Sequence, residues 1–166
     1  MKALVGKFAP DGRSYMARPV DLEGQPSWTL GQLRLMWQRK FLRDTFRMVE
    51  ELLHRDWSFL ANSQWPSEVA AGSMADWAFL SGMGRAWPIG QAGMTHFGDL
   101  PAERPTEAAW AYLWEYGLEA LHVYASHGGR WNHLATLGTD VWIGLDEQLV
   151  LDIESRYGWL EKGTVA

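Results

Sequence analysis

Eleven tryptophans in a chain of 166 residues are the feature that most limits how this sequence can fold. Each indole buries roughly 150–250 Å² when it is enclosed, so a few of them would already anchor the core of a chain this long. A single domain of this length buries roughly 70% of the surface that its unfolded chain exposes. We therefore expect the remaining indoles to form a second cluster, a pocket or a contact surface.

The rest of the composition is that of an ordinary globular protein. Hydrophobic residues make up 47% and charged residues 21%, a balance that argues against disorder. The absence of cysteine excludes disulfides, thiol catalysis and cysteine-bound zinc or iron–sulfur sites. The N-terminal apolar stretch is too short for a signal segment, and no apolar run is long enough to span a bilayer. We predict a soluble, cytoplasmic protein without a cofactor.

The net charge of −5 is divided unevenly along the chain. Residues 1–98 carry a net charge of +2, whereas residues 99–166 carry −7. The two parts could attract each other within one molecule, across a homo-oligomer, or toward a basic protein partner. Nucleic-acid binding is not expected, because it relies on neutralising phosphates and this chain is acidic.

The first half of the chain predicts a β-hairpin followed by a long helix. Residues 1–20 contain two strand-like runs joined by Ala-Pro-Asp-Gly, a sequence that favours a tight turn. From Thr29 to about Arg55, apolar residues recur at three- and four-residue steps, with basic residues between them. This pattern predicts one amphipathic helix over residues 29–55, the spine of the domain.

The second half predicts two more helices after a long loop. Residues 82–105 contain five glycines and three prolines without periodicity, which predicts a loop. Apolar spacing then favours helices over residues 106–126 and 139–157, although two short apolar runs in the latter could instead be strands. The predicted fold is therefore α+β but mostly α: a single domain, 1–166, in which the N-terminal hairpin packs on a bundle of three to four helices.

One group of polar residues has the composition of an active site. In a helix over 106–126, Glu115, Glu119 and His122 share one face, and a carboxylate beside a histidine is a route to a general base. His127 and His133 follow in a glycine-bearing segment that could fold back, so that His122, His127 and His133 are candidate metal ligands. The alternative is that these residues form the solvated side and the end of a helix, because no specific ligand spacing is present.

A second group of residues is a candidate contact surface. The long glycine-rich loop could close as a lid or meet a partner through its aromatic and soft apolar side chains. The predicted partner-binding residues are Trp87, Met94, His96, Phe97 and Trp131. The alternative is an inert connector pinned by aromatic residues.

Two functions of different classes fit these features. The first is a non-enzymatic interaction protein, such as an inhibitor, an immunity-like protein or a subunit of an assembly, which binds a macromolecule through tryptophan-rich and acidic surface. The second is a small enzyme or small-molecule binder with an aromatic pocket, in which Glu115, Glu119 and His122 supply polar groups, with or without a metal. No catalytic motif is present, so we favour the first.

Overall fold

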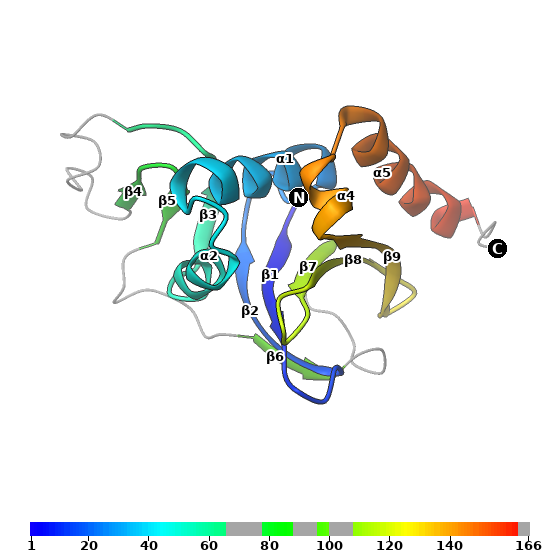
Figure 1. Cartoon of the computed structure of the whole chain (residues 1–166). Helices are drawn as coiled ribbons and strands as arrows, with labels where there is room; N and C mark the ends of the chain where they lie inside the picture. The colour runs from blue at the N-terminus through cyan, green and yellow to red at the C-terminus, as the bar shows by residue number, and fades with distance from the viewer. Residues whose placement is uncertain (66–77, 88–95, 100–107, 163–166) are drawn as a thin grey trace.

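The computed structural model describes residues 1–65, 78–87, 96–99 and 108–162, with the side chains of 78, 96–99 and 159–162 left out. In this part of the chain, nine strands form one mixed sheet. Eight of them follow the order β4-β5-β3-β2-β1-β7-β8-β9, and β6 pairs with β2 outside this path. Figure 1 shows the helices gathered along one side, with the tip of the β1–β2 hairpin extending away from α1.

The centre of the sheet is the N-terminal hairpin. Strands β1 (Ala3–Phe8) and β2 (Ser14–Val20) pair antiparallel, so the hairpin predicted over residues 1–20 is present. Asp11 stabilises the turn, because its carboxylate accepts hydrogen bonds from the backbone N–H groups of Arg13 and Ser14. The other edge of β1 pairs in parallel with β7 (Trp110–Trp114), which joins the two halves of the chain.

Three consecutive strands then form one end of the sheet. Strand β7 pairs antiparallel with β8 (Ala120–His127), which pairs antiparallel with β9 (Arg130–Gly138). The β8–β9 turn is made by Gly128 and Gly129, whose φ angles of 64° and 76° suit a two-residue hairpin loop. At the other end of the sheet lie short strands: β3 (Trp57–Leu60), β4 (Ala78–Leu80), β5 (Gly84–Ala86) and β6 (His96–Asp99).

The helices cover one face of this sheet. They are α1 (Pro26–Leu35), the π-helical segment η1 (Met36–Lys40), α2 (Thr45–Leu52), α4 (Thr139–Ile143) and α5 (Glu147–Lys162). Helix α1 packs against α5 and β3, α2 against β1, and α4 and α5 against β9. The larger hydrophobic core lies between these helices and the sheet, and it includes Trp57, Trp110 and Tyr112.

The opposite face of the sheet has a smaller core. It contains Leu4, Phe8, Ala111, Leu113 and Trp131, with Tyr124 packed against them. Side chains alternate between the two faces along a strand, so Leu113 points to this side while its neighbours Tyr112 and Trp114 point to the helices. Strand β7 is therefore buried on both faces.

The prediction of a mostly helical bundle is wrong, most clearly over residues 106–126. That segment forms β7 and β8, where helical spacing had been inferred from apolar residues. All five residues of β7 are buried, and a strand buried on both faces gives a continuous apolar run that periodicity cannot distinguish from a helix.

The other predicted helices are interrupted, and the predicted loop contains strands. Within 29–55 the chain leaves the helix after η1, where Leu42 and Arg43 have φ angles of 50° and 67°. Asp44 then caps α2 by accepting a hydrogen bond from the Arg47 N–H at 3.1 Å. The segment 139–157 is α4 and most of α5 rather than one helix. Within 82–105, residues 84–86 and 96–99 are strands, and 88–95 and 100–105 lie outside the described residues.

Of the three outcomes expected for the surplus indoles, an exposed contact surface is not seen among the described side chains. Six of these nine tryptophans are buried, and the other three are half-buried. The three half-buried rings are Trp28, Trp65 and Trp87, and two of their N–H groups donate to protein oxygens, Trp28 to Leu60 and Trp87 to Asp21. In the described residues, no helix is long and apolar enough to cross a membrane.

Candidate functional site

The β7–β8–β9 meander brings four polar side chains together on the face that the helices leave open. Glu115 follows the last residue of β7, and His122 lies opposite Thr136 in the register of β8 and β9. His133 lies opposite Tyr124, and an irregularity between Val123 and Tyr124 lets both His133 and Thr136 face the same side as His122. Residues far apart in the sequence are thus neighbours by strand pairing.

Short distances connect these groups into one network. Glu115 Oε1 lies 3.0 Å from His122 Nε2, and His122 Nδ1 lies 3.1 Å from His133 Nε2. Thr136 Oγ1 is 3.1 Å from His122 Nδ1 and 3.0 Å from His133 Nε2. The network therefore runs from a carboxylate through one imidazole to a second imidazole and a hydroxyl.

The chemistry of the partners fixes where the proton of His122 lies. An ionised carboxylate only accepts hydrogen bonds, so His122 Nε2 carries a proton that it donates to Glu115. The Nδ1 atom of neutral His122 is then a free acceptor, to which Thr136 can donate. A proton added at Nδ1 gives an imidazolium stabilised by the Glu115 carboxylate.

The surroundings of the second imidazole, His133, lower its pKa. Burial lowers the pKa of His133, and the neighbouring His122 and Arg156 lower it further, against a hydrogen bond to the backbone of Ala135 that raises it. Burial also raises the pKa of Tyr124, which keeps its phenol protonated. The cluster therefore favours the neutral form of His133 and a protonated Tyr124 phenol.

A hollow of about 410 Å³ lies beside the Glu115–His122 pair. The β1–β2 turn forms one wall, and the turn between β7 and β8 forms the other. Phe8 holds the base of the hollow, with its ring edge-on to His122 at 5.9 Å and to Tyr124 at 6.2 Å between centroids. Two carboxylates, Glu115 and Glu119, line this hollow, whose size is within the range of small-molecule sites.

The geometry supports acid–base chemistry better than nucleophilic or metal chemistry. Glu115, His122 and Thr136 have the order of a carboxylate–imidazole–hydroxyl triad, but Thr136 is not among the residues that line the hollow. Two imidazole nitrogens converge, yet the described residues contain no group of three His, Cys, Asp or Glu that could hold a metal ion. A Glu115 oxygen at the hollow can instead exchange a proton that His122 passes to or from His133 and Thr136.

The structure brings part of the predicted polar cluster into contact. Glu115, His122 and His133 meet, and Glu119 lines the same hollow from the turn, although its carboxylate is not hydrogen-bonded to His122. His127 lies apart, exposed at the end of β8 and paired with Arg130 across the hairpin.

The predicted partner-binding residues are not gathered on one exposed surface of the described structure. Trp87 is half-buried and donates its N–H to Asp21 Oδ2 at 2.9 Å, and Trp131 is only 3% exposed in the smaller core. His96 and Phe97 belong to β6, which pairs with β2, and their side chains are not described. Met94 lies outside the described residues.

Sequence reasoning missed Phe8, Tyr124 and Thr136. One signal was available: two glycines between runs that alternate in polarity favour a β-hairpin, and this hairpin places Tyr124 opposite His133 and His122 opposite Thr136. For Phe8 there was no signal, because its place beside His122 depends on the parallel pairing of β1 with β7.

Comparison with protein-family models, with curated proteins and with solved structures found no match to this chain.

Proposed function

We propose that this chain binds a small amine-bearing molecule in the hollow beside Glu115 and His122, and that Glu115 exchanges a proton with it. The observation that carries this proposal is the 3.0 Å contact between Glu115 Oε1 and His122 Nε2 at the wall of a hollow of about 410 Å³. This was the second of the two functions expected from the sequence.

The charge and the ring content of the hollow support this ligand class. Glu115 and Glu119 supply two carboxylates, and Phe8, Tyr116 and Tyr124 supply aromatic rings. Carboxylates pair with an ammonium group, and the faces of aromatic rings attract cations. The described lining residues include no Lys or Arg that would favour an anionic ligand.

The relay behind Glu115 supports proton exchange in addition to binding. Because His122 donates Nε2–H to Glu115, it can return a proton to the carboxylate and be reprotonated at Nδ1 from the side of His133 and Thr136. Glu115 is 40% exposed and His122 20% exposed at their side chains, so the pair is reachable from the hollow while remaining partly shielded from water.

Three probes that share one ring and differ in charge test the proposal. We expect calorimetric titration to show that benzylamine binds more tightly than benzyl alcohol, and that benzoate binds least. Glu115→Gln should weaken benzylamine binding by about tenfold, a loss typical of one charged hydrogen bond. Glu147→Gln, an exposed carboxylate on α5, is the matched control and should bind as the native chain does. Equal binding of the three probes would contradict the proposal.

A second function is favoured by a different surface. Leu42, between η1 and α2, is 80% exposed, and Phe46, in the first turn of α2, is 58% exposed. The exposed basic residues around them are Arg39, Lys40, Arg43 and Arg47. We propose, as the alternative, that a protein partner with an apolar centre and an acidic rim binds this patch.

Capture from the native host separates this alternative from ligand binding. A Leu42→Ser/Phe46→Ser variant should lose a partner that the native chain retains, while Leu151→Ser, another exposed apolar residue on α5, should keep it. Retention of the partner by the double variant would reject this surface. A basic partner, a homo-oligomer and a cytoplasmic location stay predictions.

A further inference from the structure

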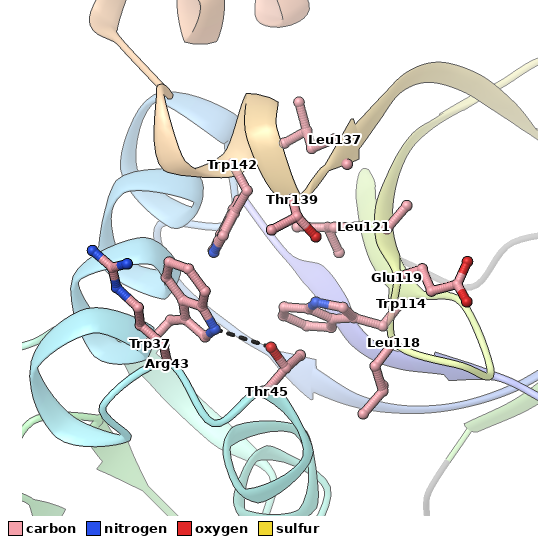
Figure 2. Close-up of a pocket in the computed structure, with 12 residues that line it drawn as sticks. Trp37, Arg43, Thr45, Trp114, Leu118, Glu119, Leu121, Leu137, Thr139 and Trp142 are labelled. Carbon is pink, nitrogen blue, oxygen red and sulfur yellow. Dashed lines mark hydrogen bonds between the residues drawn. The ribbon is translucent and has the colours of Figure 1, made fainter.

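A second hollow lies on the helix-covered side of the sheet and is walled by three tryptophans. Figure 2 shows Trp37 from η1, Trp142 from α4 and Trp114 from the end of β7 around one space. The cavity has a volume of about 180 Å³. Leu118, Ala120, Leu121 and Leu137 extend its apolar lining, and the polar residues at its border are Arg43, Thr45, Glu119 and Thr139.

The walls of this cavity are fixed by contacts within the protein. Trp37 donates its N–H to Thr45 Oγ1 at 2.9 Å, and Trp142 packs edge-on against Trp37 at 6.2 Å between ring centroids. The guanidinium of Arg43 lies 5.6 Å from the centroid of the Trp37 ring. Trp37, Trp114 and Trp142 are each at most 6% exposed, so the rings are held in place before any ligand arrives.

Two of the three indole N–H groups have no hydrogen-bond partner among the residues that the structure describes. Among the described residues, no hydrogen bond is made by Trp114 Nε1 or Trp142 Nε1. Neither nitrogen is among the buried polar atoms that are sealed from solvent without a partner, so both reach open space. An indole nitrogen can only donate, and an unpaired donor in a confined site is stabilised by an acceptor.

We propose that this cavity binds a neutral, single-ring heteroaromatic molecule that carries hydrogen-bond acceptors, with Trp114 and Trp142 donating to it. The size agrees, because a closed apolar cavity of about 150 Å³ is enough to hold benzene. The charge agrees, because the one basic and the one acidic residue at the border balance each other. This cavity lies on the other face of the sheet from the hollow of the proposed function and shares only Glu119 with its lining, and neither proposal depends on the other.

Two other ligand classes fit the cavity less well. A quaternary ammonium would meet two indole N–H donors, and the Arg43 guanidinium already stacks on Trp37. A pyranose would bring several hydroxyl groups against three indoles and three leucines, where the side-chain acceptors are Thr45, Thr139 and Glu119, and each buried hydroxyl without a partner costs free energy.

Nuclear magnetic resonance of the indole N–H groups tests the proposal directly. Nicotinamide, a pyridine ring with a carboxamide, is the probe. We expect it to shift the indole signals of Trp114 and Trp142 and to leave that of Trp28 unchanged, since the Trp28 N–H donates to Leu60 O at 2.7 Å. Trp114→Phe and Trp142→Phe should each weaken nicotinamide binding by about fivefold, while Trp28→Phe should not.

A variant that narrows the cavity but is expected to fold gives a second test, in which loss of binding cannot be attributed to unfolding. Gly138 lines the cavity, has a φ of −72°, and has no atom within 4 Å of where a Cβ would stand. Gly138→Leu is therefore expected to fold and to abolish nicotinamide binding, whereas Gly31→Leu, also in open space but outside this cavity, should bind as the native chain does. Absence of shifts at Trp114 and Trp142, or tighter binding of methyl glucoside or tetramethylammonium than of nicotinamide, would overturn the proposal.

Discussion

The two faces of the sheet carry two hollows of opposite character, separated by the turn between β7 and β8. On the helix-covered face the cavity is walled by three indoles and three leucines, with Arg43, Thr45, Glu119 and Thr139 at its border. On the open face the hollow contains a carboxylate–histidine network and two acidic groups. Glu119 lines both hollows from the turn. Covering one face with helices brings indole and leucine side chains together there, whereas the uncovered face holds a network of charged and polar side chains.

The same contrast applies to the two cores. The core under the helices contains Trp57 and Met48 at 0% exposure, whereas on the open face Phe8 borders a hollow. We therefore expect substitutions on the helix-covered side to lower the stability more. Substitutions on the open side should have the larger effect on function at the polar site. Three predictions test this division.

The largest effect is expected from removing a large ring under the helices. Trp57→Ala should lower the free energy of unfolding by about 4 kcal/mol, because it leaves a closed cavity and removes the N–H bond to Leu52 O. Phe8→Ala should cost about 2–3 kcal/mol, since the hollow beside it is open and limits the cavity left behind. Urea denaturation measures both. A larger loss of unfolding free energy for Phe8→Ala than for Trp57→Ala would contradict the expected difference between the two cores.

A matched pair of tyrosines gives an intermediate effect. The Tyr112 hydroxyl is buried on the helix side and donates to Gly24 O at 2.6 Å, so Tyr112→Phe should cost about 1–2 kcal/mol. Tyr124 lies on the open face without a hydrogen bond from its hydroxyl in the described structure, so Tyr124→Phe should change stability by less than about 0.5 kcal/mol. Thermal unfolding of the two variants side by side provides the measurement, and equal losses would count against the contrast.

The smallest effect concerns pH. Burial lowers the pKa of His133 below its usual 6.5, so the folded chain binds a proton there less readily than the unfolded chain does. The stability from neutral His133 is complete above about pH 6.5 and is lost as the pH falls toward the lowered pKa. His122, Arg156, Glu115 and Tyr124 are the charged or titratable groups of this cluster.

Unfolding measured at about pH 7.5 and about pH 5.5 tests this sign. We expect the native chain to be less stable at the lower pH, and this difference to shrink in His133→Asn. His127→Asn, an exposed histidine of the same hairpin, should leave the difference as it is. If the difference in stability between the two pH values were the same in His133→Asn as in the native chain, His133 would not contribute to the pH dependence.

Part of the fold could be predicted from local signals. The β1–β2 hairpin could be predicted because Pro, Asp and Gly each favour a tight turn and stand together there. Such a turn forms without contacts from distant parts of the chain. The interruption of the predicted 29–55 helix could not be found in this way, because Leu42 and Arg43 adopt left-handed φ angles that neither residue prefers. The surroundings hold them there, since the Arg43 N–H donates to Trp37 O at 2.6 Å.

The candidate site was predicted in part, and for the wrong reason. Glu115 and His122 were grouped because a seven-residue separation returns to one face of a helix, yet they meet because a hairpin turn joins β7 to β8. A separation of seven residues brings these two side chains together both on a helix and across this hairpin. The predicted proximity is therefore confirmed, whereas the predicted helix is wrong. The number of tryptophans led us to expect a second cluster, a pocket or a contact surface. The structure has a pocket walled by three tryptophans, and none of the described rings is exposed.

By itself, the sequence determined the large interior, the N-terminal hairpin and the presence of a carboxylate and histidines within one short segment, because these depend on composition and on neighbours along the chain. Only the tertiary structure decided that residues 110–114 and 120–127 are strands and that β1 lies beside β7. A run of buried apolar residues satisfies a helix and a central strand equally well. The choice is made by what covers its two faces, and those residues lie far away in the chain.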